Sequence, residues 1–210
     1  MKLIDNVTST VRDDLRQILH KGSKVSIAAA CFSIYAYQAL KKQLDAVDEV
    51  RFVFTAPTFI QEKPSKQQRE FYIPRLSRER SLYGTEFEVK LRNELTQKAI
   101  AQECAQWIRR KVHFRSNVSN QQIHGFINVD ETTYMPINGF TTVDLGCERG
   151  NNVFYFVHRT EAFENGRKFL NLFEEIWNDA QKLQDVTDCV VESISTVYQE
   201  NAPEFIYFFA

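Results

Sequence analysis

The chain has 210 residues, 43% of them hydrophobic and 25% charged, which is the composition of an ordinary globular domain with a sizeable core. Its 7 Gly and 5 Pro argue against a long flexible linker, and no apolar run is long enough to span a bilayer. The four cysteines form no CxxC pair, and the N-terminus does not resemble a signal peptide. We therefore expect reduced thiols, a cytoplasmic location and no membrane partner.

The net charge of -1 conceals an uneven distribution of charge along the chain. Residues 161–210 hold ten acidic side chains against three basic ones, so residues 1–160 carry an excess of six positive charges. A polyanionic partner should approach the first 160 residues rather than the C-terminal part. The alternative is a solvated acidic surface with no ligand.

The first quarter of the chain predicts a helix followed by a βαβ unit. Apolar residues at four-residue spacing predict an amphipathic helix over residues 4–20. The small and apolar residues at 24–33 predict a strand buried on both faces, followed by a crossover helix at 36–44 and a second strand at 49–55. Strands joined in this way pair in parallel, with a right-handed crossover.

Residues 57–85 show no clear period, and aromatic side chains are interspersed among basic ones along them. A loop of this length in a compact domain is usually functional or disordered. We predict that its basic side chains contact the phosphates of a nucleic acid while its aromatic rings stack on bases. The alternative is a surface excursion that its aromatic residues pin to the domain. The predicted basic contacts are Lys63, Lys66, Arg69, Arg75, Arg78 and Arg80.

The rest of the chain predicts further strands between helices. The expected elements are a helix at 86–111, strands at 112–115, 123–129, 134–142 and 153–157, and two terminal helices at 161–178 and 180–199. The fold class is therefore α/β, with a mixed, mostly parallel sheet flanked by helices and two C-terminal helices. We expect one domain over residues 1–180.

The chain ends in a strongly apolar segment, E-F-I-Y-F-F-A, after Pro203. An exposed segment of this kind is a liability, so it either docks on the domain or a partner or continues into a longer protein. We favour the second interpretation. Residues 181–210 would then form a C-terminal helix at the start of the next region.

Two short segments, I-H-G-F-I-N-V-D-E and Y-M-P-I-N-G-F-T-T, carry a resemblance to a known family. With the βαβ start and the phrase K-G-S-K-V-S-I-A-A-A-C-F-S-I-Y-A, they resemble the phospholipase D superfamily. The similarity is greatest to the phospholipase D-like domain at the N-terminus of some bacterial helicases. The resemblance implies a single phospholipase D-like half, whose family pattern is His-x-Lys-x4-Asp followed by a Gly-Ser turn and an Asn.

On this resemblance, His124 matches the histidine that attacks phosphorus, but Phe126 stands where the family has lysine. Glu131 falls at the aspartate position, and Asn152 or its neighbour Asn151 at the amide. The remaining matches are Asn138-Gly139 for the glycine turn and Thr141 and Thr142 for the hydroxyl. Losing a preorganised charge such as the lysine raises a phosphoryl-transfer barrier by about 3 kcal/mol or more.

The resemblance and the missing lysine together predict a degenerate, non-catalytic module that binds or positions nucleic acid, with DNA as the expected partner. No P-loop motif occurs in the chain, so a helicase motor would lie downstream in the same protein. The histidines show no zinc-ligand spacing, and we expect no metal or cofactor.

Two other functions remain open. The first is a phospholipase D-type nuclease or phosphodiesterase that uses His124; because the chain has one half-site, it would act as a symmetric homodimer. The second is a dimerisation or protein-interaction domain. For His124 alone, a structural role on a strand is the simplest alternative.

Overall fold

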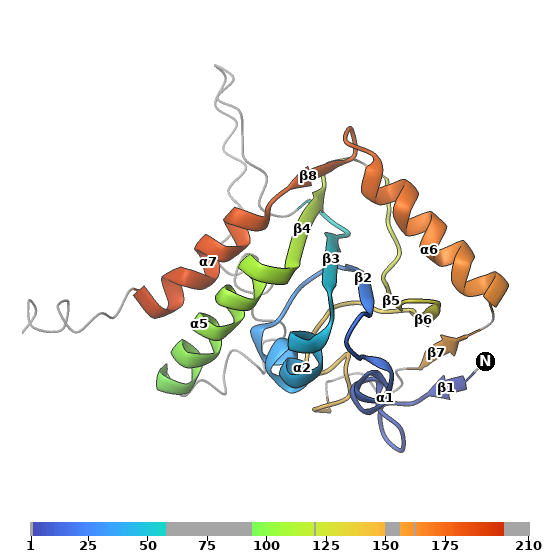
Figure 1. Cartoon of the computed structure of the whole chain (residues 1–210), viewed down its shortest axis with the longest axis horizontal. Coiled ribbons are helices and arrows are strands. Elements are labelled where there is room, and N and C mark those ends of the chain that lie inside the picture. The colour runs from blue at the N-terminus through green and yellow to red at the C-terminus, as the bar shows by residue number, and fades with distance from the viewer. Residues whose placement is uncertain (1, 58–93, 120, 150–155, 162, 200–210) are drawn as a thin grey trace, which may run out of the picture.

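The computed structural model describes residues 2–57, 94–119, 121–149, 156–161 and 163–199. In this part of the chain, eight strands form one open sheet with helices on both faces (Figure 1). The strands are β1 (Lys2–Ile4), β2 (Lys24–Ala29), β3 (Glu49–Phe54), β4 (Val112–Asn117), β5 (Phe126–Val129), β6 (Thr132–Met135), β7 (Val157–Thr160) and β8 (Leu183–Asp185). The helices are α1 (Val11–Ile18), α2 (Ile34–Ala46), α5 (Glu94–Lys111), α6 (Phe163–Asn178) and α7 (Thr187–Gln199).

The α/β class and the mixed sheet are confirmed, but the expectation of a mostly parallel sheet is wrong. The strand order is β1-β7-β6-β5-β2-β3-β4-β8, and only the pairs β2–β3 and β3–β4 are parallel. Parallel neighbours need a long crossover, which the chain provides only between β2 and β3 and between β3 and β4. From β5 onward, short connections give antiparallel pairs instead.

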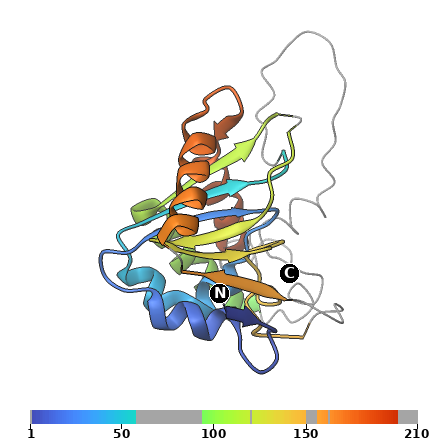
Figure 2. The same cartoon turned by 90° about the vertical axis from the view of Figure 1, so that its right-hand side faces the viewer.

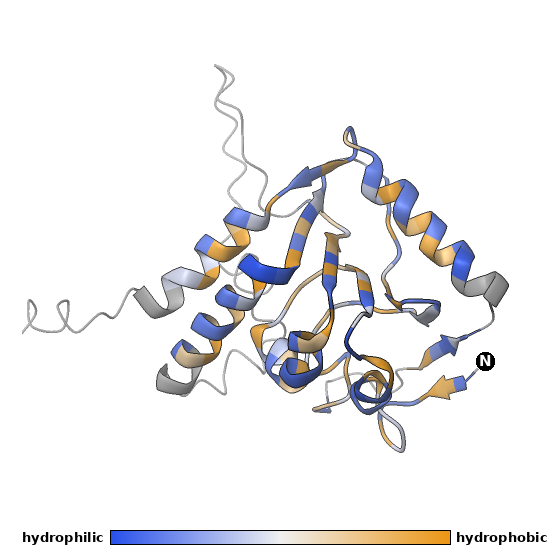
Figure 3. Cartoon of the chain, viewed as in Figure 1, coloured by the Kyte–Doolittle hydropathy of each residue, from blue (hydrophilic) through white to orange (hydrophobic). Residues whose placement is uncertain are grey.

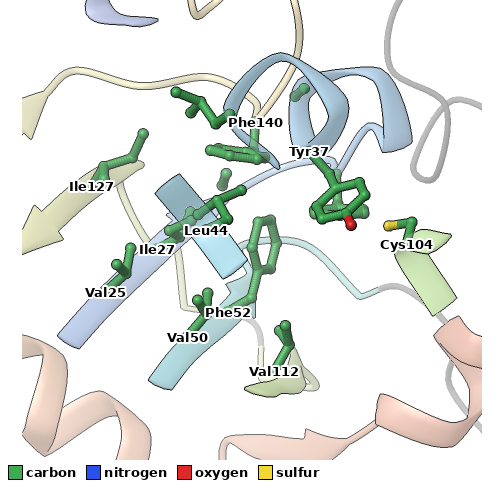
Figure 4. Close-up of a cluster of buried hydrophobic side chains, with 14 of the residues drawn as sticks. Val25, Ile27, Tyr37, Leu44, Val50, Phe52, Cys104, Val112, Ile127 and Phe140 are labelled. Atoms are coloured by element: carbon green, nitrogen blue, oxygen red, sulfur yellow. The ribbon is translucent and has the colours of Figure 1, made fainter. Parts of the chain in front are cut away.

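The two faces of the sheet carry different cores. Helices α1, α2, α5 and α7 cover one face, and of the described helices only α6 covers the other (Figure 1; Figure 2 views the molecule from the side on which α6 lies). The larger core gathers aliphatic and aromatic side chains from β2, β3 and β4 under α2 and α5 (Figure 4). Trp107 of α5 lies within it, stacked on Tyr37 at 4.7 Å between ring centroids. Its indole N–H donates to the Leu44 carbonyl at 3.1 Å.

The smaller core joins α6 to the other face. Phe173 and Trp177 of α6 pack with Phe126 of β5 and with the small side chains of Ala28 and Val53. Apolar and polar residues alternate along α6, as the hydropathy colouring of Figure 3 shows, because only one stripe of the helix meets the sheet.

Several predicted boundaries change at the ends of the chain. The helix expected at 4–20 begins at Val11, because Thr10 caps it by accepting the Asp13 N–H, and residues 2–4 instead form the edge strand β1. The strand expected at 24–33 ends at Ala29, where the chain turns toward Ser33, the N-cap of α2.

The second terminal helix, expected at 180–199, is divided into two elements. Residues 183–185 form β8, which pairs with β4, and α7 begins only at Thr187, whose N–H is held by the Asp185 carboxylate at 2.9 Å. Strand β8 and helix α7 therefore belong to the same sheet and helix layer as the residues before position 180. None of the helices in the described ranges has an apolar stretch that reaches the length of a membrane span.

Candidate functional site

His124 lies at the edge of the sheet where the parallel strands end. It precedes β5, which begins at Phe126 and runs antiparallel to β2, with Phe126 opposite Ala28 near the carboxyl end of β2. The side chain of His124 is exposed. Because β5 begins only at Phe126, the strand is shorter than the one expected at 123–129, and His124 does not lie on it as the structural alternative assumed.

A crossing segment after β6 explains why β5 begins late. The chain from Pro136 passes over the start of β5, where the Ile137 N–H donates to the Gly125 carbonyl at 3.0 Å. It then reaches the end of β2, where the Asn138 carbonyl accepts from the Ala30 N–H at 2.8 Å. A Cβ atom on Gly125 would lie 1.8 Å from the Ile137 carbonyl oxygen, so only glycine fits beneath this crossing. The crossing therefore lies on Gly125, the residue that follows the exposed His124.

The segment that matched the family's glycine turn forms a compact support beside His124. A Cβ atom on Gly139 would lie 2.5 Å from Cys31 Sγ and 2.9 Å from Asp144 Oδ2, so this glycine also allows a close approach. The Thr141 hydroxyl donates to the buried Asp144 carboxylate at 2.5 Å. The Thr142 hydroxyl donates to Glu148 at 3.1 Å. Both hydroxyls are buried and serve the turn itself, while Asn138 is exposed.

Phe126 occupies the position of the family lysine, and its ring is turned away from solvent. It is 3% exposed and lies beneath α6, with ring centroids 6.0 Å from Phe169 and 6.1 Å from Phe173. The aromatic ring therefore fills the smaller core and contributes no charge near His124. Arg149 is a basic residue that could in principle replace the family lysine, but it is exposed, and no contact between it and His124 is seen among the described residues.

Glu131 lies far from His124, at the opposite end of β5. It is in the turn between β5 and β6, and a strand of this length extends about 13 Å. Its carboxylate is exposed and faces Arg167 of α6 at 3.6 Å. The neighbouring Asp130 ties this turn to the start of β2, because its carboxylate accepts a hydrogen bond from the backbone N–H of Lys24 at 3.0 Å. The acidic pair is thus part of the hairpin, and the structure does not bring it to His124.

The other predicted site residues lie outside the described residues. These are the amide candidate Asn152 and its neighbour Asn151, and the basic residues Lys63, Lys66, Arg69, Arg75, Arg78 and Arg80. The described chain stops at Pro57, just after β3, at the same edge of the sheet as His124.

Asn117 supports this edge and was not singled out from the sequence. It is 1% exposed and ends β4, where its amide N–H groups donate to the carbonyls of Thr55 at 3.0 Å and Gln121 at 2.8 Å. Its side-chain oxygen accepts the Ser119 N–H at 2.9 Å. The loop that leads to His124 is thereby tied to the end of β3. The N-V-S phrase, with Asn and Ser two residues apart, is the turn signal that could have indicated it.

Asp14 forms a second buried polar group, which is structural. Its carboxylate accepts from Tyr134 Oη at 2.6 Å, Lys2 Nζ at 2.5 Å and Arg159 at 2.9 Å, so it joins α1 to β6, β1 and β7. Burial opposes ionisation, but the hydrogen bonds from Lys2 and Tyr134 and the charge of Arg159 outweigh it and lower the pKa of Asp14. Burial first, and then Asp14, raises the pKa of Tyr134.

In the ranges that the structure describes, no three His, Cys, Asp or Glu side chains gather closely enough to hold a metal ion. Comparisons with protein-family models and with curated proteins found no match to this chain. The site is therefore interpreted from its own geometry: one exposed imidazole next to the glycine on which the chain crosses, without a contact to a cation in the described residues.

Proposed function

We propose that this chain is a non-catalytic, phospholipase D-like module that binds or positions nucleic acid. The observation that carries the proposal is the pair His124 and Phe126: the imidazole is exposed, whereas the side chain two residues on is a buried phenyl ring. A phosphohistidine mechanism needs a cation to offset the charge on the transferring phosphoryl group. An imidazole alone can still donate a hydrogen bond to a phosphate oxygen or a base.

The position of His124 in the sheet supports ligand binding. Strand β2 pairs in parallel with β3 and antiparallel with β5, so the chain changes direction beside β2. Open α/β sheets bind ligands outside the carboxyl ends of their parallel strands, where the strand order reverses. The excess of positive charge over residues 1–160 favours a polyanion at this end of the molecule. DNA is the partner we propose, with a helicase region downstream in the same protein.

Fluorescence anisotropy with labelled DNA tests this proposal. We expect binding at low salt that weakens as salt rises, because phosphate contacts release counterions. His124→Ala should weaken binding, whereas the matched variant His113→Ala should not, since His113 is an exposed histidine on β4 near the opposite edge of the sheet. Absence of binding at low salt contradicts the proposal.

A dimeric phosphodiesterase is the second candidate, and the exposure of His124 is the observation that favours it, because a nucleophile must reach its substrate. A DNA-cleavage assay of the wild type and His124→Ala separates the two functions. Cleavage that disappears in the variant supports a catalytic dimer. Equal activity in the two proteins removes His124 from any cleavage.

A further inference from the structure

Buried polar atoms without hydrogen-bond partners gather on the α6 face of the sheet. Within the described part of the chain, four of the five such atoms lie there: both side-chain atoms of Asn128, the Thr133 hydroxyl and Nδ1 of His158. The fifth, Arg159 Nε, lies on the opposite face, where the same guanidinium pairs with Asp14. Asn128 lies opposite Thr133 in the β5–β6 pair, and Thr133 lies opposite Thr160 of β7, two residues from His158 on the same face. Three neighbouring strands therefore present these unsatisfied groups together.

The contacts around them fix the face on which they lie. Ser26, opposite Asn128 on β2, accepts a hydrogen bond from Arg51, which pairs with Glu174 of α6. Phe126, two residues before Asn128, packs on Phe169 and Phe173 of the same helix. Asn128, only 1% exposed, therefore lies between the sheet and α6.

The cluster combines an amide, a hydroxyl and an imidazole with neighbouring aromatic rings. The charged group beside it, Arg51, is already paired with Glu174 at 2.5 Å. What remains unsatisfied is a carboxamide donor and acceptor side by side, a hydroxyl and a ring nitrogen, next to the phenyl rings of Phe126 and Phe169. A carboxamide pairs with the edge of a nucleobase through both atoms, and aromatic rings stack on its face. A phosphate would require cations instead.

We propose that Asn128, Thr133 and His158 form a site for a single nucleobase, which enters beneath the N-terminal part of α6. The proposal rests on the nucleic-acid binding proposed above and assigns a base-reading site to it. Asn128 pairs with the edge of the base, and the Thr133 hydroxyl and His158 Nδ1 offer further hydrogen bonds.

The two halves of α6 are held to the sheet by different contacts. Its C-terminal half is held by the buried rings of Phe173 and Trp177, by the Glu174–Arg51 pair and by Arg115, which donates to the Trp177 carbonyl. Nearer the N-terminus, Phe169 packs on Phe126 and the exposed pair Arg167–Glu131 lies at 3.6 Å. Entry of a base beneath this part of the helix requires it to move away from β5 and β6 while the C-terminal half stays in place.

Binding of two single-stranded probes tests the site: an oligodeoxyadenylate and an abasic oligonucleotide of the same length. The wild-type chain should bind the adenylate about tenfold more tightly, since a good bidentate contact discriminates by about fivefold to a hundredfold. Asn128→Leu should bind both probes with the affinity that the wild type has for the abasic one. Thr133→Val should lose part of the preference, and Asn171→Leu, on the exposed side of α6, should keep all of it.

The variants should remain folded, because Asn128→Leu and Thr133→Val remove groups that have no partner in the folded chain. Thermal unfolding should therefore show a melting temperature equal to or above that of the wild type. A second readout is an adenylate carrying one 2-aminopurine, whose fluorescence should change on binding to the wild type and not to Asn128→Leu.

The outcomes separate the two proposals. If the wild type binds neither probe at low salt, the proposed nucleic-acid binding fails and the base site fails with it. If the wild type binds both probes equally, or if Asn128→Leu keeps the full preference for the adenylate, only the base site is overturned. A preference for the adenylate that Asn128→Leu alone abolishes supports it.

Discussion

The two faces of the sheet differ in how completely their polar groups are satisfied. On the face covered by α1, α2, α5 and α7, the buried polar groups of Trp107, Tyr134 and Asp14 all have partners, and Arg159 Nε is the one buried polar side-chain atom in the described residues there that lacks one. On the α6 face, Asn128 and Thr133 are equally buried and have none in the described part of the chain. The first face is built for stability, and the second retains groups whose burial without partners costs about 1–3 kcal/mol each.

The largest effect should come from the larger core. Trp107→Ala removes the largest of the fully buried side chains, together with its hydrogen bond to the Leu44 carbonyl, and should lower the free energy of unfolding by about 3–5 kcal/mol. Denaturant titration measures it. Leu172→Ala, at an exposed position of α6, is the control and should change stability by about 0.5 kcal/mol or less. Equal losses in the two variants would contradict the packing described for α5.

The crossing over β5 should be nearly as sensitive. Gly125→Ala places a Cβ atom against the Ile137 carbonyl and should destabilise by about 1–3 kcal/mol, because backbone must move to relieve the contact. Gly22→Ala meets no atom within 4 Å and bears only the strain of a positive φ of 95°, about 1 kcal/mol. Chemical denaturation should rank Gly125→Ala as the more harmful. The reverse order would mean that the crossing does not determine where His124 lies.

Acid should destabilise the contacts through which Asp14 joins α1 to strands β1, β6 and β7. Because the pKa of Asp14 is lower in the folded chain than in the unfolded one, its stabilisation is present above the unfolded value. It is lost as the pH falls through the folded value, by about 1.4 kcal/mol for each unit of depression. Unfolding curves between pH 6 and the acid limit measure it. Asp14→Asn should be less stable at neutral pH, and its free energy of unfolding should change less with pH than that of the wild type. Profiles of the two proteins that run parallel would contradict the lowered pKa of Asp14.

The smallest effect should be that of Glu131. If this residue only forms an exposed pair with Arg167, Glu131→Gln should change stability by about 0.5 kcal/mol or less and leave DNA affinity unchanged. Anisotropy and thermal unfolding of the same samples provide both values. A large loss of DNA affinity would place Glu131 in the site despite its position at the other end of β5.

Local sequence patterns predicted the central β2–α2–β3 unit, but they did not predict the edge strand β8 or the antiparallel pairings of β5, β6 and β7. The small-residue run of β2, the helix after it and the β3 strand were all readable because their periods are local. Strand β8 is only three residues long, too short to show a period, and its partner β4 lies far away in the chain. The antiparallel pairings of β5, β6 and β7 follow from short connections rather than from the strands' own composition.

The site was predictable only in part for the same reason. The I-H-G-F phrase indicated His124 and the loss of the lysine, but not that the chain near Ile137 crosses Gly125, because that contact is tertiary. The partners of Asp14 lie up to 145 residues away in the sequence, so no local pattern predicts them. Asn128 looked like any polar residue in a strand, and only the register with Thr133 and the cover of α6 distinguish it.

One measurement tests the central claim, that the exposed imidazole of His124 holds nucleic acid without cutting it. End-labelled DNA is incubated with the full chain at a concentration at which anisotropy shows the DNA to be bound, and the same sample is then run on a denaturing gel. The proposed function predicts bound but intact DNA, since Phe126 supplies no charge beside His124. Cleavage products from the wild type that are missing with His124→Ala would contradict it.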